Sequence, residues 1–283
     1  MTVNAEAGRN AIFIQEESVE TPEGLELVRD RSGIYLTKKG DKNEKPKQRC
    51  DPGESIMPLD LRDVIGKWQF LSLSPDPMGR PTVKKMAGNG AMVLNRDGSN
   101  LAQYLLNIRT KDTAAFDGIV EAMRFVLDYA RNVEPVETRE IQPTMYLKML
   151  ERLRDESIEI PGWLISTGTI RILALLAVLR NPDPPPLLVV EEIENGLDPR
   201  SLNLVLEEIR TAVEAGDTQV ILTTHSPYFL DLLDLSHLVL CERVDGVPVF
   251  KRTSDMKTAR EWAKSFAPGR LYVMDRLHVE DQS

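Results

Sequence analysis

The chain has 283 residues, of which 42% are hydrophobic and 28% are charged, and this composition is typical of an ordinary globular protein. Its formal charge of −9 argues against a protein that coats nucleic acid over its whole surface, although a local basic face is compatible with it. The two cysteines, Cys50 and Cys241, stand in unrelated contexts, which excludes a disulfide framework or a cysteine metal cluster and favours a reducing compartment.

Neither a membrane span nor a signal peptide is expected. The most apolar run, residues 164–179, is interrupted by Ser, Thr, Gly and Arg and falls short of a membrane-spanning length. The first ten residues are polar and lack the apolar core of a signal peptide. We therefore expect a cytoplasmic protein without membrane contact.

Residues 1–95 are predicted to be rich in strands, because short apolar runs alternate with turn residues. The segment 38–52 is dense in Lys, Asp, Gly and Pro, which predicts a mobile loop. Its lysines could contact nucleic acid, but the interleaved acidic residues favour a solvated loop instead. The expected elements are strands at 11–14, 25–28, 34–36 and 68–73, a hairpin turn at 30–33 and a short helix at 59–65.

Residues 96–160 are predicted to be mostly helical. Apolar residues at helical spacing mark one face in each of two successive segments. Residues 133–136 are expected to interrupt the helices, and 145–153 carry apolar residues at strand-like or mixed spacing. The two apolar faces consist of Leu101, Tyr104, Leu105 and Ile108, and of Phe116, Ile119, Val120, Met123, Val126 and Leu127.

Residues 161–283 alternate helices and strands, as α/β folds do. The four apolar residues 187–190 predict a strand buried on both faces, and the three prolines before it fix its start. A nearly all-apolar helix precedes this strand at 170–179, and a second apolar strand follows at 219–222. The remaining expectations are a helix from Pro199, a short helix near 228–233, paired strands at 237–241 and 247–250, and a tail helix at 259–266.

Polar side chains capable of chemistry stand where these two strands end. Glu191 and Glu192 follow the first strand directly, and neighbouring side chains of an extended chain point opposite ways, so one could hold a metal while the other polarises a water. His225 follows the second strand, and open α/β sheets present ligand groups at the carboxyl ends of their strands. An acidic pair alone is more often two solvated carboxylates. His237 and His278 are interpreted as ordinary histidines, since neither has metal-ligand spacing.

Two helix starts carry further signals. Ser166, Thr167, Gly168 and Thr169 precede the apolar helix, where free backbone N–H groups can bind a phosphate, although an ordinary serine cap is the alternative. The chain then turns at an Asn-Gly pair after the glutamates. Asp198 is predicted to cap the next helix, with proline at its first position.

In the order serine–glycine loop, helix, strand with two glutamates, helix and strand with histidine, the chain resembles the C-terminal part of a P-loop ATPase of the AAA family, on its ABC/SMC-like branch. The resemblance is strongest over residues 166–243, with a weaker echo at 95–101. It implies an α/β fold of the P-loop NTPase type, an ABC ATPase-like mixed sheet flanked by helices. Residues 1–95 would be its β-rich, antiparallel N-terminal part, 96–160 a helical insertion and 161–283 the C-terminal ATPase subdomain.

The resemblance also implies ATP and Mg²⁺ as ligands. Glu191 takes the Mg²⁺-side position of the Walker B strand, and Glu192 is the catalytic carboxylate that orients the attacking water. His225 is similar to the switch histidine that senses the γ-phosphate.

Two further elements of the resemblance concern assembly. Ser166, Gly168 and Thr169 resemble the signature loop, which contacts the nucleotide held by the opposite subunit. Asp198 lies in a segment similar to the D-loop, at the same interface. The resemblance therefore implies an ATP-dependent homodimer or a partner ATPase chain.

The chain departs from the family pattern in three places. Thr167 stands where glycine is usual and Ile193 where proline is frequent, and both are tolerated changes. The serious departure is that no Gly-x-x-x-x-Gly-Lys-[Ser/Thr] phosphate loop occurs in the sequence. We expect that the chain starts after the position of that loop, as a fragment or a truncated or split gene, rather than being a naturally loop-less relative.

Two classes of function follow. The first is an ATP-binding and ATP-hydrolysing ATPase that needs its phosphate loop from a missing N-terminal segment or a partner chain. The alternative is a non-hydrolytic, ATPase-derived binding or regulatory module. A metal-dependent nuclease using Glu191, Glu192 and Glu194 has a weaker basis, since the acids of such sites converge from several elements. Nucleic-acid binding and the process driven by the ATP cycle stay open.

Overall fold

The computed structural model describes residues 2–5, 12–20, 25–30, 33–38, 65–84, 92–139, 142–154 and 156–278. The chain divides into two compact units, Met1–Gly66 and Lys67–Ser283. The described part of the first unit is a four-stranded antiparallel sheet in chain order. Its strands are β1 (Thr2–Ala5), β2 (Ile12–Glu20), β3 (Leu25–Asp30) and β4 (Gly33–Lys38).

The three strands predicted in this unit are confirmed, and each extends beyond its predicted bounds. β1 was not predicted, because its four residues carry too little apolar pattern. The loop expected at 38–52 and the short helix expected at 59–65 fall almost wholly outside the described residues.

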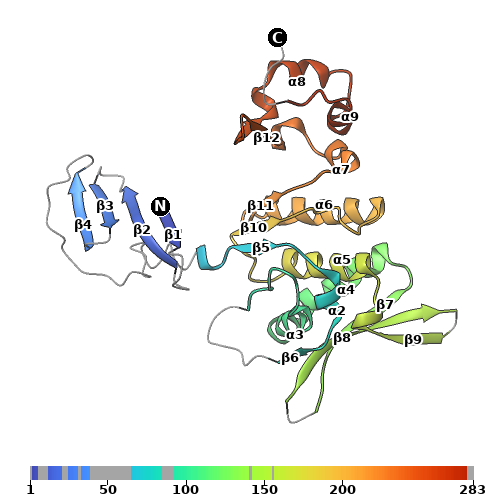
Figure 1. Ribbon diagram of the computed structural model, residues 1–283. Helices are drawn as coiled ribbons and strands as arrows, with labels where there is room; N and C mark the ends of the chain where they lie inside the picture. The colour runs from blue at the N-terminus through green and yellow to red at the C-terminus, as the bar shows by residue number, and fades with distance from the viewer. Residues whose placement is uncertain are drawn as a thin grey trace. The chain divides into compact units, whose positions relative to one another are not determined.

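The second unit is built around a three-stranded parallel sheet, in the order β11-β10-β5 (Figure 1). These strands are β5 (Gln69–Leu71), β10 (Leu187–Val190) and β11 (Gln219–Leu222). All three were predicted, and the pairing makes β10 the central strand. Parallel strands far apart in sequence therefore end along one edge of the sheet.

The two faces of this sheet differ. Leu188 and Val190 face the hydrophobic core and are buried. On the opposite face the register aligns Phe70, Val189 and Ile221 in one row, and the two outer residues of the row are 52% and 48% exposed. Within β10 itself, Leu187 and Val189 lie on this face and are only partly buried, so the prediction that β10 is buried on both faces is wrong for the second face.

Helices cover the core face. α5 (Thr167–Leu179) is buried from Thr169 to its end, as an all-apolar helix in a core should be. The core also holds apolar faces of α3 (Leu101–Lys111), α4 (Thr113–Val126) and α6 (Pro199–Glu214), and the faces predicted for α3 and α4 are the buried ones. The short helix α2 (Pro75–Gly79) follows β5 and packs against α5.

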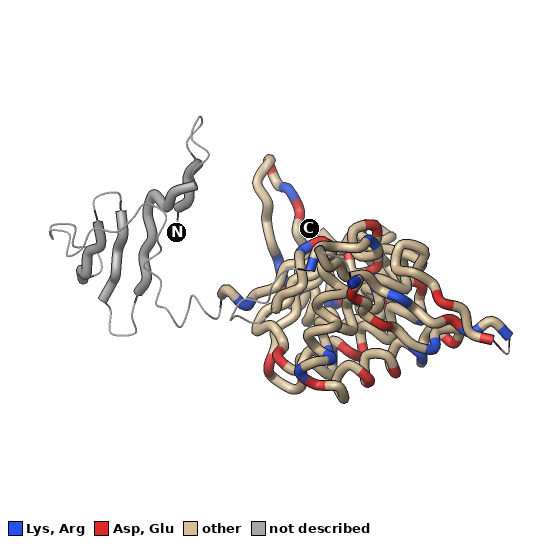
Figure 2. Tube along the Cα trace, turned by 90° about the horizontal axis from the view of Figure 1, so that it is seen from below, with Lys and Arg blue, Asp and Glu red and all other residues tan. Residues whose placement is uncertain are grey.

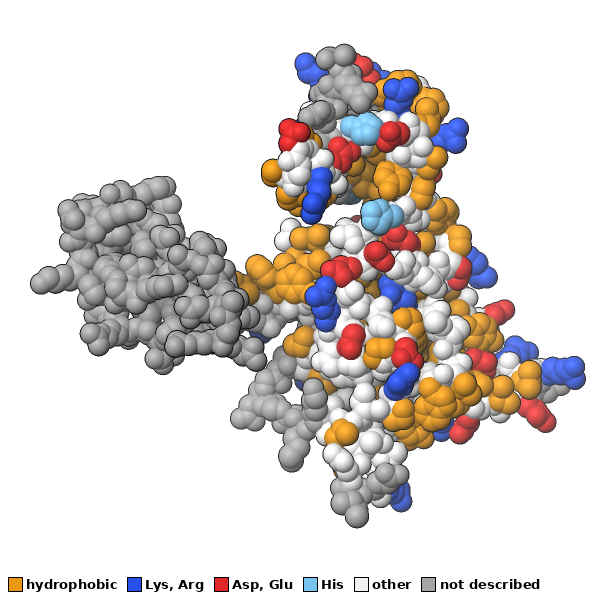
Figure 3. Space-filling view, viewed as in Figure 1, with side chains coloured by type: hydrophobic (Ala, Val, Ile, Leu, Met, Phe, Trp, Pro, Cys, Tyr) orange, Lys and Arg blue, Asp and Glu red, His pale blue; other side chains and the backbone are white. Residues whose placement is uncertain are grey.

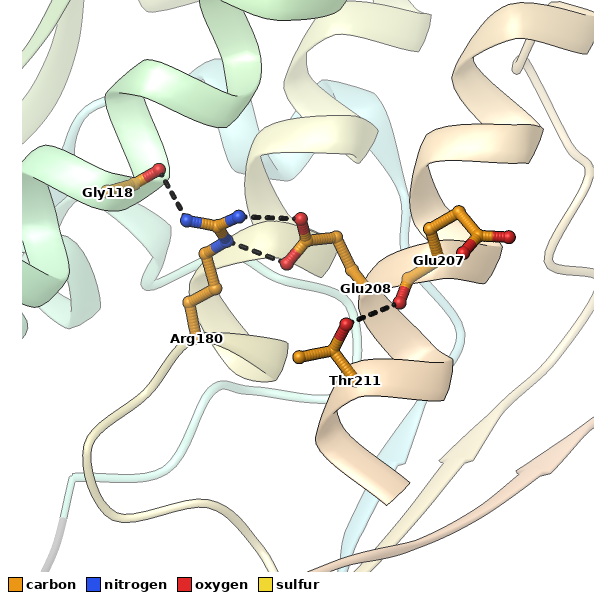
Figure 4. A network of polar contacts seen from close by, with 5 residues as sticks. All are labelled: Gly118, Arg180, Glu207, Glu208 and Thr211. Carbon is orange, nitrogen blue, oxygen red and sulfur yellow. Dashed lines mark hydrogen bonds and ion pairs between the residues drawn. The ribbon is translucent and has the colours of Figure 1, made fainter. Parts of the chain in front are cut away.

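An ion pair joins three of these helices where α5 ends (Figure 4). The guanidinium of Arg180 donates two hydrogen bonds of 2.7 Å to the carboxylate of Glu208 on α6 and one of 2.9 Å to the carbonyl of Gly118 on α4. The bond to Glu208 raises the pKa of Arg180 above its usual value. This fork-shaped contact fixes the spacing of α4, α5 and α6.

The region 96–160 contains strands as well as helices. After α4 the chain forms β7 (Ala130–Glu137), β8 (Thr144–Leu153) and β9 (Glu156–Pro161), which pair antiparallel, and β6 (Thr82–Val83) pairs with the start of β8. The break predicted at 133–136 is wrong, because these residues lie inside β7. Val133 is buried, and Pro135 is accommodated opposite Leu147.

The C-terminal residues form a smaller layer with its own core. α7 (Pro227–Asp231) follows β11, and the hairpin β12 (Val239–Val244) and β13 (Val247–Arg252) confirms the predicted strand pair. The predicted tail helix is shorter than expected, as α8 (Lys257–Trp262), and α9 (Pro268–Val273) was not predicted. Three short 3₁₀ turns lie among the described residues of the second unit, at Gly162–Leu164 (η1), Leu235–His237 (η2) and Thr253–Asp255 (η3).

Charged residues are spread over the second unit. Figure 2 shows basic and acidic residues interleaved along the described chain, so neither sign dominates a whole face. No helix within the described residues combines the length and the apolar character needed to cross a bilayer.

Candidate functional site

Glu191, Glu192 and His225 all follow the carboxyl ends of two neighbouring parallel strands, β10 and β11. The backbone N–H of Glu191 donates to the carbonyl of Leu71 at 2.8 Å, and the N–H of Thr223 donates to the carbonyl of Val190 at 3.0 Å. Strand pairing therefore continues to the point where the polar residues begin. Glu191, Glu192 and His225 are all exposed at this edge.

Glu191 is held by residues from the segment after β5 and from the loop before α3. Its carboxylate accepts a hydrogen bond of 2.8 Å from Nη2 of Arg96, and the hydroxyl of Ser72 is a second partner. The bond to Ser72, followed by that to Arg96, lowers the pKa of Glu191 below its usual value. The side chain is thus a carboxylate at neutral pH with a cation already beside it.

The loop that supplies Arg96 is fixed by its own contacts. The carbonyl of Arg96 accepts from the N–H of Ser72 at 2.8 Å, and Asp97 accepts from the N–H of Ser99 at 3.0 Å. That bond lowers the pKa of Asp97. Gly98 has a φ of +76°, which glycine adopts without strain, and an added Cβ would lie 2.5 Å from Met78. This segment is the weaker echo noted in the sequence, and Arg96 within it was not predicted as a site residue.

Glu192 has different partners from Glu191. Its N–H donates to Oγ1 of Thr223 at 2.9 Å, its carbonyl accepts from Nη2 of Arg171 at 3.0 Å, and its carboxylate accepts from the side-chain amide of Asn195. Its φ of +49° lies in the left-handed region, which costs free energy for a residue with a Cβ. The two glutamates therefore have separate partners, and the positive φ means that the chain at Glu192 is not the extended chain from which opposite directions were expected.

Arg171 on α5 is the main site residue that the sequence reasoning missed. It is only 4% exposed, and its Nη1 donates to the carbonyl of Leu73 at 2.6 Å while Nη2 reaches Glu192. Burial lowers the pKa of Arg171, and the charges of Glu192 and Glu194 oppose that shift. One guanidinium therefore ties α5 to the segment after β5 and to the backbone of Glu192. The available signal was a single arginine in an otherwise apolar helix.

His225 is fixed through both its backbone and its ring. Its N–H donates to Oε1 of Glu194 at 2.7 Å, and Nδ1 lies 3.3 Å from the hydroxyl of Tyr272 on α9. Oε2 of Glu194 and Nε of Arg171 are buried without a hydrogen-bond partner among the described residues. Neither Glu194 in this role nor Tyr272 was predicted.

The acids at this edge do not form a metal cluster. Glu191 pairs with Arg96, Glu192 with Asn195 and Glu194 with His225, and within the described ranges no three His, Cys, Asp or Glu side chains converge on one point. The nuclease hypothesis needs such convergence, and these contacts do not support it.

The serine–glycine loop starts α5 as a cap. Oγ of Ser166 accepts from the N–H of Thr169 at 3.2 Å and lies 2.6 Å from its Oγ1. The expectation that Thr169 binds nucleotide does not fit its side chain, which is 2% exposed and also bonds to the hydroxyl of Tyr129 at 2.9 Å. The side chain of Thr169 thus packs inside the unit, whereas Ser166 and Thr167 are exposed.

The same loop lies directly against the turn that follows the glutamates. A Cβ on Gly168 would be 2.4 Å from the carbonyl of Gly196, so only glycine permits this approach. Gly196 itself has a φ of +72°. The start of α5 and the turn after β10 are therefore neighbours.

Asp198 caps α6 as predicted. Its Oδ1 accepts from the N–H groups of Arg200 at 2.9 Å and Ser201 at 3.2 Å, and its Oδ2 accepts from the hydroxyl of Ser201 at 2.7 Å. These bonds, with that of the Ser201 hydroxyl the largest, lower the pKa of Asp198. The residue is an established helix cap with an exposed outer surface.

The donor set fits part of a nucleotide site. A single carboxylate such as Glu191 suits Mg²⁺, which usually keeps waters and binds one or two carboxylates together with phosphate oxygens. The pocket beside Glu191 measures about 110 Å³ and is bordered by Phe70, Arg96 and Val189. Ligand pockets usually measure roughly 300–1,000 Å³. The described residues therefore provide groups for the phosphate end of a ligand but not a complete pocket.

Comparison with known proteins places most of the chain in a family. Residues 39–231 match the family described as "AAA domain, putative AbiEii toxin, Type IV TA system". A comparison with proteins of curated function finds no match.

The chain also matches several solved structures. One, described as "Structural biochemistry of ATP-driven dimerization and DNA stimulated activation of SMC ATPases", is 15% identical with a TM-score of 0.40, over 58% of this chain and 99% of that chain. The second is the Smc head domain with an extended coiled coil bound to the C-terminal domain of ScpA from Pyrococcus furiosus, at 15% identity and a TM-score of 0.40. The match covers 60% of this chain and 42% of that chain. The third, the Smc head domain with a coiled coil and joint from Pyrococcus yayanosii, has 15% identity, a TM-score of 0.36 and coverage of 60% and 34%.

Proposed function

Because the chain belongs to the AAA domain family that it matches over residues 39–231, a family of P-loop ATPases, we propose that it binds and hydrolyses ATP once a phosphate loop is supplied. The observation that carries the proposal is the meeting of Glu191, Glu192 and His225 at one edge of the parallel sheet. Such an edge is where open α/β sheets bind their ligands. The three residues come from two strands joined by a helix.

Each of the three residues has a distinct role in this proposal. Glu191 holds Mg²⁺, which when bound neutralises charge on the phosphate oxygens. Glu192 orients the attacking water and accepts its proton, and its backbone is held for this by Thr223 and Arg171. His225 donates a hydrogen bond to the γ-phosphate, and its backbone is anchored by Glu194.

The loop at the start of α5 acts on a second subunit in this proposal. Ser166 and Thr167 are exposed, and free N–H groups at the start of a helix of 13 residues favour an anion. The contact of Gly168 with Gly196 places this loop beside the turn that leads to Asp198. A partner copy or a partner ATPase chain would thus meet both elements on one surface.

The second face of the sheet is a candidate docking surface for the phosphate-loop segment. Parallel sheets are normally covered on both faces. The row of Phe70, Val189 and Ile221 is apolar and partly exposed, and Figure 3 shows orange side chains gathered over this part of the molecule. A phosphate-loop segment, from upstream of this chain or from a partner, would complete the site by docking there.

The alternative is a binding or regulatory module that does not hydrolyse ATP. It is favoured by the ion pair between Arg96 and Glu191, which leaves the metal-side carboxylate already neutralised, and by the small size of the pocket beside it. In either case we propose a cytoplasmic location, in keeping with the free, exposed Cys241.

Substitution of the two glutamates separates these functions. The chain is combined with the segment or partner that carries Gly-x-x-x-x-Gly-Lys-[Ser/Thr], and ATP binding and hydrolysis are measured. Glu192→Gln is expected to abolish hydrolysis and keep ATP binding, because an amide cannot accept the proton of the water. Glu191→Gln is expected to raise the Mg²⁺ concentration needed for turnover. Equal loss of ATP binding in both variants would show that the acids are structural.

A further inference from the structure

Residues 235–278, which we call the C-terminal module, have a hydrophobic core of their own. Met256, Ala259, Leu271 and Leu277 form this core, separate from the main core of the second unit. The module begins four residues after the end of α7, and α7 starts at Pro227, two residues after His225 and directly after its capping Ser226. A change in how the module docks can therefore reach the histidine through few contacts.

The module docks on α7 through a close backbone contact. The N–H of Gly269, at the start of α9, donates to Oδ1 of Asp231 at 2.6 Å. A Cβ on Gly269 would lie 1.9 Å from the carbonyl oxygen of Pro227, so any larger residue would push α9 away from α7. The contact between α9 and α7, which we call the α7–α9 joint, is therefore closest at Gly269.

Tyr272 extends from α9 to the ring of His225. Its hydroxyl lies 3.3 Å from Nδ1, which leaves Nε2 of the imidazole as the nitrogen without this partner. Glu194, from the turn after β10, bonds to the backbone N–H of His225, and Asp231 on α7 is engaged by Gly269. Among the described residues, Tyr272 is therefore the one whose polar group is shown to contact the ring of His225.

We propose that Tyr272 is a positioning residue for His225, donating its hydroxyl hydrogen to Nδ1 so that the neutral ring carries its proton on Nε2. In a neutral imidazole one nitrogen donates and the other accepts, and the partner of one nitrogen sets the tautomer. Phosphate oxygens only accept hydrogen bonds, so a sensor of the γ-phosphate must offer an N–H. This last role rests on the proposed function, whereas the tautomer itself does not.

The proposal assigns the C-terminal module a part in ATP sensing. The contact to His225 comes from α9, and α9 is placed by the fit of Gly269 against α7. A partner or ligand that shifts the module would release Nδ1 and allow both tautomers. The histidine would then offer its donor to phosphate for only part of the time.

The tautomer is measured by ¹⁵N NMR of the imidazole nitrogens in the chain itself. The chain has three histidines, so few signals need assignment. At about pH 9, where histidines of ordinary pKa are neutral, we expect wild-type His225 to show one tautomer, with the proton on Nε2. Tyr272→Phe is expected to shift His225 towards a mixture of the two.

Tyr228→Phe is the matched control. Tyr228 is 40% exposed, as is Tyr272, and its hydroxyl bonds to Nδ2 of Asn203 at 2.6 Å rather than to the histidine. It should leave the His225 signals as in the wild type. An Nδ1-protonated ring in the wild type, or a Tyr272→Phe spectrum identical to the wild type, would overturn the proposal.

Gly269→Val tests the link through the α7–α9 joint. This variant keeps Tyr272 but forces α9 away from α7. The Nδ1-protonated tautomer of His225 should therefore appear, as is expected for Tyr272→Phe. The signals of His237 report whether the fold persists. If Gly269→Val leaves the single tautomer, the module does not control the ring.

Turnover is measured separately with the phosphate loop supplied: Tyr272→Phe should lower kcat and leave KM unchanged. If Tyr272→Phe loses the single tautomer of His225 but the wild type hydrolyses no ATP, the proposed function is refuted and the positioning role of Tyr272 stands.

Discussion

Arg171→Met removes the guanidinium that joins α5 to two other segments. One is the segment that follows β5, and the other is the turn that contains Glu192. Arg171 is buried and donates two hydrogen bonds, to the carbonyls of Leu73 and Glu192. Methionine fills much of the same volume and makes neither bond. The variant therefore tests the polar contacts with little change in packing.

The expected loss can be worked out from these contacts. Hydrogen bonds that involve a charged group contribute about 1.5–3 kcal/mol each, which gives about 3–6 kcal/mol for the pair. Removing the charge recovers part of the desolvation cost that lowers the pKa of Arg171. We therefore take the lower end of that range, a net loss of about 3 kcal/mol. For a unit of this size it corresponds to a fall in Tm of about 6–12 °C.

Thermal and urea unfolding of the whole chain measure this loss, with Arg96→Met as the matched control. Arg96 bonds to the neighbouring Glu191, but both side chains of that pair are exposed, so the Tm should stay within about 2 °C of the wild type. Equal Tm values for the two variants would refute the reasoning that the buried hydrogen bonds of Arg171 stabilise the unit. A selective fall in Tm for Arg171→Met would support it.

The remaining predictions concern the loop, the helix joint, the α6 cap and the chain alone. With the phosphate loop supplied, Ser166→Arg should abolish ATP-driven dimerisation and turnover together while the monomer stays folded; an unchanged sedimentation coefficient of hydrolysis-deficient Glu192→Gln protein upon ATP addition would rule out the two-chain arrangement. Arg180→Ala should cost about 1–2 kcal/mol in urea unfolding, because it breaks the fork to Glu208 and Gly118, whereas Arg80→Ala, in an exposed pair with Asp76, should cost no more than about 0.5 kcal/mol. The lowered pKa of Asp198 means that its stabilisation is fully present above the usual value of 3.8 and is lost as the pH falls through the lower folded-state pKa, so Asp198→Asn should flatten the acid side of the stability curve; an unchanged acid limb would contradict the cap assignment. Calorimetric titration of the chain alone with Mg·ATP should show no binding at micromolar concentration, and a micromolar Kd would refute the need for a phosphate loop.

The features that the sequence predicted well are local ones. An apolar run that ends in acids marks the end of β10, and Asp198 followed by proline marks the start of α6, because neighbouring residues alone determine such signals. The order of these motifs was sufficient to indicate the fold. The break expected around Pro135 failed because pairing with β8 and packing of Val133 into the core outweighed the local preference of proline.

Other features depend on contacts between distant residues, and only the tertiary structure decided them. The sequence could name Glu192 and His225, but not that Arg171 holds the carbonyl of one or that Tyr272 touches the ring of the other. The sequence placed Thr169 in the phosphate-binding loop, but only the packing of α5 shows that its side chain bonds to Tyr129. Local pattern determines where an element starts, ends and turns polar, whereas the partner of a side chain is set by how separate elements pack, which no stretch of neighbouring residues encodes.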